Sequence, residues 1–138
     1  MADARPERKQ PESLRLRDIA PGFTVEDLQK SIAFYVDALG FTVHERWENE
    51  GELQGVMLRA GNCRIGLSQD DFAKGRDRVK GIGMSIWLTT IQDLGVVVAR
   101  VKEAGVTPEQ DLAEMPWGGR AFTVVDPDGF RITFTNEA

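Results

Sequence analysis

The stretches Phe23-Thr24-Val25-Glu26-Asp27-Leu28 and Leu88-Thr89-Thr90-Ile91-Gln92-Asp93-Leu94 decide the fold of this chain, because the second repeats the first about 66 positions later. Each stretch begins as a strand and includes an aspartate, a residue that commonly caps the start of a helix. About three turns of amphipathic helix follow in each copy, and they end at Gly40 and Gly105. A chain built from two such units usually holds its ligand between them.

Three strands are predicted after the first helix, over residues 41–47, 53–59 and 63–68. The leading strand of this unit is assigned to the alternating residues from Leu14 to Val25, which place Ile19 on the same face as Val25. The first unit therefore has the order βαβββ.

The second unit follows the same order. Met84 opens its leading strand, and three strands after the helix are expected near Gln110, at residues 121–125 and at residues 130–135. Asp126-Pro127-Asp128-Gly129 is predicted to form a tight turn, since proline fixes φ and glycine accepts the left-handed conformation.

The chain is predicted to be a single α+β domain over residues 14–138, preceded by a flexible tail over residues 1–13. Within the domain, the first βαβββ unit is assigned to residues 14–69, a polar bridge to 70–82 and the second unit to 83–135.

Composition excludes several classes of protein. The chain has 22 acidic and 17 basic side chains and a net charge of −5, which argues against a nucleic-acid-binding surface. No apolar run approaches the length of a membrane span, so no membrane partner is expected. The single cysteine gives no internal disulfide, and a reducing cytoplasmic location is the default.

Several local strings in this order resemble the vicinal oxygen chelate superfamily, which contains glyoxalases, bleomycin resistance proteins and extradiol dioxygenases. The resemblance covers residues 18–135, and the strings that carry it are Val25-Glu26-Asp27, Ser31, Phe34-Tyr35, Leu39-Gly40-Phe41, Pro116-Trp117-Gly118-Gly119-Arg120, Phe122 and Asp126-Pro127-Asp128-Gly129. It implies that eight strands curl as a mixed sheet around a central cavity, with the helices outside.

Enzymes of that superfamily hold a divalent metal in the cavity with His, Glu or Gln side chains on the first and last strands of each unit. Carried over by spacing, those positions fall on Ala20, Gly66, Thr133 and either Ser85 or, if the segment is aligned without a gap, Ile86. Alanine and glycine offer no side-chain donor, and neutral hydroxyls alone are poor ligands. The sequence therefore predicts a member without the metal, and no cofactor is expected.

Other reactive groups have ordinary structural interpretations. His44, the only histidine, lies on the second strand, away from the superfamily's ligand strands. Cys63 is expected to be a small buried hydrophobe. The carboxylate pairs Asp70-Asp71 and Asp126 with Asp128 are assigned to the bridge and the turn, and no catalytic residue is assigned.

Alternation along the strands predicts which side chains face the cavity. Gly66 and Thr135 share this face, and the residues expected to bind ligand are Trp47, Arg64, Ser68, Ser85, Trp87, Thr89, Trp117, Arg131 and Thr133. Indoles, hydroxyls and guanidinium groups together can stack a planar ligand and form hydrogen bonds with its rim.

Each of these assignments has an alternative. Trp87 could pack in the core, Trp47 could cover a sheet face or a dimer contact, and Trp117 could pack within its own turn. Arg64 and Arg131 could pair with nearby acids at the rim of the sheet, which is the usual fate of a strand arginine.

Two functions follow from the resemblance. The favoured one is a metal-free protein that binds a small planar or cationic organic molecule, as drug-sequestering bleomycin resistance proteins do, in a tryptophan-lined cavity or a homodimer cleft. The alternative is a lyase, isomerase, thiol transferase or dioxygenase of the same superfamily with metal ligands from other positions, such as His44 with Glu45, or from a partner chain.

Overall fold

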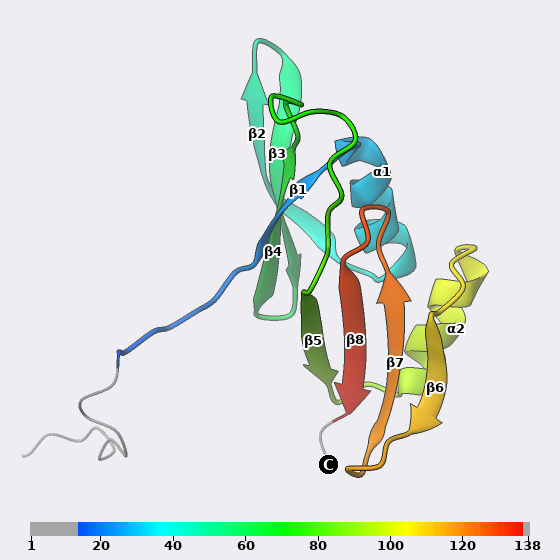
Figure 1. Cartoon of the computed structure of the whole chain (residues 1–138). Helices are drawn as coiled ribbons and strands as arrows, with labels where there is room; N and C mark the ends of the chain where they lie inside the picture. The colour runs from blue at the N-terminus through cyan, green and yellow to red at the C-terminus, as the bar shows by residue number, and fades with distance from the viewer. Residues whose placement is uncertain (1–13, 137–138) are drawn as a thin grey trace, which may run out of the picture.

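The computed structural model describes residues 14–136, in which two βαβββ units follow one another (Figure 1). The elements of the first unit are β1 (Gly22–Val25), α1 (Leu28–Ala33), a π-helical segment (Phe34–Ala38), β2 (Thr42–Asn49), β3 (Glu52–Ala60) and β4 (Cys63–Gln69). Those of the second unit are β5 (Ser85–Thr90), α2 (Leu94–Glu103), β6 (Gln110–Glu114), β7 (Arg120–Val125) and β8 (Arg131–Asn136).

Both helices begin at the predicted aspartates. The Asp27 carboxylate accepts a hydrogen bond from the Lys30 amide at 3.2 Å, and the Asp93 carboxylate accepts one from the Gly95 amide at 2.8 Å. These bonds satisfy amide groups that have no partner within the helix. Gly40 follows the first helix with a φ of 90°, a conformation that glycine adopts without strain.

The strands form two four-stranded sheets, with the orders β1-β4-β3-β2 and β5-β8-β7-β6. In each sheet the first and last strands of the unit pair in parallel and the other pairs are antiparallel. The predicted α+β class and the two βαβββ units are thus confirmed, and the eight strands are divided between two hydrogen-bonded sheets. β1 and β5 each lie at an open edge of their sheet.

One face of each sheet packs against the helices and forms the core. Buried residues alternate along β4 as predicted, at Ile65 and Leu67. In β8, Ile132 and Phe134 are buried as predicted, but Thr133 between them is buried as well, at 9% exposure. Burying such side chains stabilises the fold by about 1.5–3 kcal/mol each. The opposite face of each sheet turns away from the helices.

The two units meet on the helix side. The rings of Phe23 and Phe130 stack at 4.1 Å between centroids, and the Tyr35 hydroxyl donates a hydrogen bond of 2.8 Å to Asp126. Asp128 accepts hydrogen bonds from the Glu26 amide at 2.9 Å and the Ser31 hydroxyl at 3.3 Å. We call these contacts the joint, and they attach the β7–β8 turn of one unit to the first helix of the other.

The linker between the units is also held at the joint. Lys80 pairs with Asp70 at 2.9 Å, and both side chains are buried. This hydrogen bond is the main cause that lowers the pKa of Asp70. A Cβ atom at Gly81 would overlap the backbone of Gly129, so the linker lies directly against the β7–β8 turn. The predicted polar bridge is therefore a packed part of the fold.

Three sequence-based assignments were wrong. Residues 14–21 are not a strand, and Ile19 is 74% exposed because this segment projects from the body without a partner strand (Figure 1). Met84 lies before β5 and is exposed, and Cys63 is exposed because β4 begins there, at a tight turn. The predicted tail over residues 1–13 lies outside the described residues. Neither helix within residues 14–136 has the length and apolar character needed to cross a membrane.

Candidate functional site

The sheet faces that turn away from the helices carry the residues predicted to bind ligand. We call them the N-terminal open face and the C-terminal open face. The first carries Trp47, Gly55, Met57, Arg59, Arg64, Gly66 and Ser68, and the second carries Ser85, Trp87, Thr89, Thr123, Arg131, Thr133 and Thr135. The strand face on which the sequence predicted these residues is the face on which they lie in the observed strands.

The C-terminal open face combines hydroxyls with an indole. The parallel register of β5 and β8 sets Trp87 beside Thr133 and Thr89 beside Thr135. The hydroxyls of Thr89 and Thr135 lie 3.2 Å apart, and those of Thr123 and Thr133 lie 2.8 Å apart. A hydroxyl can both donate and accept, so the exposed Thr89 and half-buried Thr135 keep hydrogen-bonding capacity for a ligand, whereas Thr133 is buried.

Trp117 joins this face from the β6–β7 loop. Its ring lies 5.9 Å from that of Trp87 between centroids, at an interplanar angle of 44°. Trp117 is 66% exposed and Trp87 is 56% exposed. Trp87 is therefore not packed in the core, and Trp117 is not packed within its own turn. The structure brings together two indoles from segments about 30 positions apart, and both residues remain exposed.

The N-terminal open face carries the third indole. Trp47 in β2 lies opposite Gly55 in β3, and a Cβ atom at Gly55 would come within 3.3 Å of the indole. The absence of a side chain at Gly55 lets the ring lie close to the sheet while remaining 46% exposed. Sequence reasoning missed Gly55, although a glycine inside a strand is a known sign of close approach by another group.

The predicted binding residues form two groups rather than one within a single chain. Trp47, Arg64 and Ser68 lie on the N-terminal open face, and the other six belong to the C-terminal open face or the loop beside it. Among the described residues, Trp47 makes no ring contact with Trp87 or Trp117.

Both predicted arginines are engaged by acids from irregular segments. Arg131 donates to Glu109 through Nε at 2.8 Å and through Nη2 at 3.2 Å. Arg64 donates through Nε at 3.0 Å to Asp18, and its Nη2 contacts the same carboxylate oxygen. Both arginines therefore pair with acids at the rim of the sheet, which was the alternative to a role in ligand binding. The sequence had not indicated which acids these are.

The Asp126 and Asp128 carboxylates are occupied by the joint. Asp126 also accepts hydrogen bonds from the amides of Asp128 and Phe130, both at 2.9 Å. Burial raises the pKa of Asp126, and burial beside Asp126 raises the pKa of Tyr35. These groups bind one another in the folded protein, which agrees with their assignment to a structural turn.

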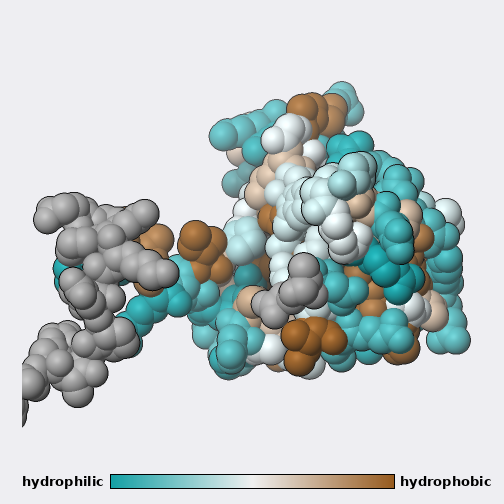
Figure 2. Space-filling view, turned by 90° about the horizontal axis from the view of Figure 1, so that it is seen from below, coloured by the Kyte–Doolittle hydropathy of each residue, from teal (hydrophilic) through white to brown (hydrophobic). Residues whose placement is uncertain are grey.

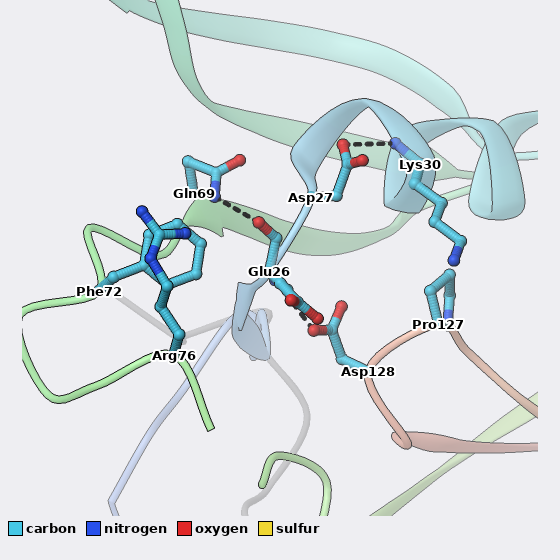
Figure 3. Close-up of a pocket in the computed structure, with 8 residues that line it drawn as sticks. All are labelled: Glu26, Asp27, Lys30, Gln69, Phe72, Arg76, Pro127 and Asp128. Atoms are coloured by element: carbon cyan, nitrogen blue, oxygen red, sulfur yellow. Dashed lines mark hydrogen bonds between the residues drawn. The ribbon is translucent and has the colours of Figure 1, made fainter. Parts of the chain in front are cut away.

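A separate polar pocket of about 420 Å³ lies where α1, the linker and the β7–β8 turn meet (Figure 3). It is lined by Glu26, Asp27, Lys30, Gln69, Phe72, Arg76, Pro127 and Asp128. The Gln69 amide donates to the Glu26 carbonyl at 2.6 Å, and Arg76 lies over the Phe72 ring at 4.3 Å. None of the residues predicted to bind ligand lines this pocket.

The positions to which the resemblance assigns metal ligands do not fit a metal here. Ala20 precedes β1, and Gly66 in β4 has no side chain. Ser85 and Thr133 both lie on the C-terminal open face, but the Thr133 hydroxyl is 2.8 Å from that of Thr123. These residues supply neither an imidazole nor a carboxylate, so no chemical step is assigned to a metal at these positions.

His44 and Glu45, the relocated ligands considered above, lie at an irregularity in β2, where their side chains approach to 3.8 Å. Within residues 14–136, no three His, Cys, Asp or Glu side chains gather as a metal site would require. The pair therefore has no third ligand in the described part of the chain.

Comparisons with known proteins agree with this architecture. The Glutathione transferase FosA of Serratia marcescens is 32% identical over 111 residues, which cover 78% of this chain and 72% of the relative. The Bleomycin resistance protein of Geobacillus stearothermophilus is 29% identical over 132 residues, which cover 83% of this chain and 92% of the relative.

The fold is also that of TnmS3, an antibiotic binding protein from Streptomyces sp. CB03234, with a TM-score of 0.70 and 22% identity over 92% of this chain and 100% of that protein. Residues 18–134 match the sequence model of one family throughout. The chain belongs to the Glyoxalase/Bleomycin resistance protein/Dioxygenase superfamily.

Proposed function

We propose that this protein binds a planar organic molecule against the indoles of its open faces, without a metal, and that a homodimer completes the cleft. The observation that carries the proposal is the exposure of all three tryptophans on or beside these faces, at 46–66%. Indoles are usually well buried, and several exposed together on sheet faces indicate a binding surface.

The two kinds of groups on the C-terminal open face have different roles in the proposal. Trp87 and Trp117 supply flat apolar surface, on which an aromatic ring stacks with a gain of about 0.5–1.5 kcal/mol beyond the burial of area. The threonine hydroxyls orient the ligand through hydrogen bonds. Proton-transfer chemistry has no support here, because the paired Asp126 and Asp128 carboxylates belong to the joint.

The relatives also support the binding of a small organic molecule. One is named for bleomycin resistance and a structural neighbour is described as antibiotic binding. A ligand of that general class, a natural product with aromatic rings, suits open faces that carry indoles and hydroxyls. FosA is a transferase by name, but the positions that would hold a metal are occupied here by Ala20, Gly66 and hydroxyl residues, so we favour binding over catalysis.

A second copy of the chain is the proposed partner. The open faces of one chain lie on separate sheets, and each sheet has an open edge, at β1 and at β5. The segment before β1 projects from the body and exposes Leu14, Leu16 and Ile19, and Figure 2 shows its apolar surface in brown. A homodimer in which the N-terminal open face of one copy meets the C-terminal open face of the other would shelter these surfaces. The cytoplasmic location predicted from the sequence stays a prediction.

Binding is tested by titrating the protein with bleomycin and with N-phenylnaphthylamine while tryptophan fluorescence is recorded. Replacing Trp87 or Trp117 by alanine should weaken affinity by about tenfold, which corresponds to about 1.4 kcal/mol of lost stacking and burial. Ile91→Ala removes an exposed apolar side chain outside the open faces and is the control. Unchanged affinity in both tryptophan variants would refute the proposed site.

The homodimer cleft is tested by light scattering and by mixing two variants, Trp47→Ala and Trp87→Ala. If each cleft combines faces from two chains, a mixed dimer contains one cleft with both indoles intact. Random exchange of subunits should then restore about a quarter of the wild-type clefts. A monomer in solution, or a mixture that restores no tight sites, would contradict a cleft shared between chains.

A further inference from the structure

Two of the three arginines on the open faces, Arg64 and Arg131, pair with carboxylates, and this has a consequence for ligand choice. Arg131 belongs to β8 on the C-terminal open face, and Glu109 reaches it from the segment before β6. Arg64 belongs to β4 on the N-terminal open face, and Asp18 reaches it from the segment before β1. Each face therefore carries a guanidinium group whose charge is balanced locally.

The pair on the C-terminal open face has the stronger geometry. Both carboxylate oxygens of Glu109 accept from the Arg131 fork, at 2.8 and 3.2 Å, which is a bidentate arrangement. The hydrogen bond from Arg131 to Glu109, followed by the attraction of its charge, raises the pKa of Arg131. The guanidinium thus stays charged while its Nε and one Nη are directed at the protein's own acid.

This pair contributes little to folding. The Arg131 and Glu109 side chains are 50% and 45% exposed, and ion pairs exposed to this degree are screened by water. Its main physical effect is on the electrostatic potential of the C-terminal open face. A ligand anion that binds the Nε and Nη2 edge of Arg131 would have to displace Glu109 and would then lie beside a free carboxylate.

We propose that Glu109 determines the charge selectivity of the binding site, because it occupies the Arg131 fork and makes the C-terminal open face select uncharged planar aromatic ligands over anionic ones. The inference rests on the proposed function and extends it from the shape of the ligand to its charge. Uncharged ligands keep the full stacking surface of Trp87 and Trp117, and they leave the ion pair intact.

Two probes with the same aromatic scaffold test the selectivity. N-phenylnaphthylamine is uncharged, and anilinonaphthalene sulfonate carries one negative charge. Wild-type protein should bind the uncharged probe more tightly. The Glu109→Gln variant frees the Arg131 fork, so its affinity for the sulfonate should rise by about tenfold, while its affinity for the uncharged probe stays within about twofold.

Glu103→Gln is the matched control, because Glu103 is an exposed residue at the end of α2 and its substitution changes the net charge equally. A rise in sulfonate affinity in Glu109→Gln alone supports the proposal. An equal rise in both variants, or no rise in either, overturns it.

The tryptophan variants separate this inference from the proposed function. If Trp87→Ala weakens binding of the uncharged probe while Glu109→Gln leaves sulfonate affinity unchanged, only the charge selectivity is wrong. If wild-type protein does not bind the uncharged probe, or Trp87→Ala and Trp117→Ala both leave its affinity unchanged, the proposed site is wrong and the inference fails with it.

Discussion

The hydrogen bond between Tyr35 and Asp126 provides a direct test of the joint. Tyr35→Phe removes only the hydroxyl, which is buried and donates to the Asp126 carboxylate at 2.8 Å. Hydrogen bonds to charged groups contribute about 1.5–3 kcal/mol, and the carboxylate left behind would be buried without this donor. We expect the free energy of unfolding to fall by about 2 kcal/mol, which for a chain of 138 residues lowers the Tm by roughly 8 °C.

The loss should depend on pH in a defined direction. Burial raises the pKa of Asp126 above its value in the unfolded chain, whereas the bond from Tyr35 lowers it. A carboxyl group whose pKa is higher in the folded state than in the unfolded state adds to the free energy of unfolding at low pH. This contribution is fully present below the unfolded-state pKa and is lost as pH rises through the folded-state pKa. Without the Tyr35 hydroxyl, the pKa of Asp126 in the folded state rises further. Tyr35→Phe should therefore lower the free energy of unfolding more at pH 7.5 than near pH 4.

Urea denaturation of wild type, Tyr35→Phe, Asp126→Asn and the double variant at both pH values measures the loss and the coupling between the two residues. Thr42→Val, which removes an exposed hydroxyl elsewhere, is the control and should change stability by less than about 0.5 kcal/mol. A Tyr35→Phe loss below about 0.5 kcal/mol, or one that grows toward pH 4, would refute this account of the joint.

Three further outcomes are expected. Gly81→Ala should lower the Tm well below that of Gly83→Ala, because both positions have positive φ but only the Cβ at Gly81 would overlap Gly129; equal melting temperatures would show that the linker contact is unimportant. Gly55→Ala should lower the Tm, change the emission of Trp47 and weaken binding of N-phenylnaphthylamine, since the new Cβ would lie 2.9 Å from the Leu67 carbonyl oxygen and 3.3 Å from the indole; an unchanged spectrum would contradict the observed packing. Protein purified without a tag and incubated with Zn²⁺, Ni²⁺, Mn²⁺ or Fe²⁺ should hold less than about 0.1 metal per chain by plasma mass spectrometry, and a value near one would return the choice to an enzyme.

Local features of the sequence predicted local features of the structure. The helix starts at Asp27 and Asp93 and the alternation of buried residues in β4 depend on neighbouring residues, and these predictions were confirmed. In β8 the alternation was only partly right, because Thr133 is buried between Ile132 and Phe134. Alternation was misleading at Ile19, because a strand also needs a partner to pair with. The described chain begins to pair with β4 only at Pro21, whose carbonyl accepts from the Gly66 amide at 2.8 Å.

Contacts between distant segments could not be predicted in the same way. Tyr35 and Asp126 are 91 positions apart, and Arg64 and Asp18 are 46 positions apart. The acid that reaches Arg131 comes from an irregular segment, where no periodic pattern indicates the direction of a side chain. The sequence therefore indicated which residues occupy the open faces, but not which of them are already engaged by the protein.

The position of the joint, on the helix side of the molecule, has a consequence for how this protein can change. The buried Tyr35 and Asp126 support the fold, whereas Trp87, Trp117 and Arg131 are exposed, and exposed positions tolerate substitution at little cost in stability. Substitutions on the open faces can therefore change ligand preference during evolution without compensating substitutions in the core. The same separation makes the open faces suitable for randomised libraries, in which most variants should still fold.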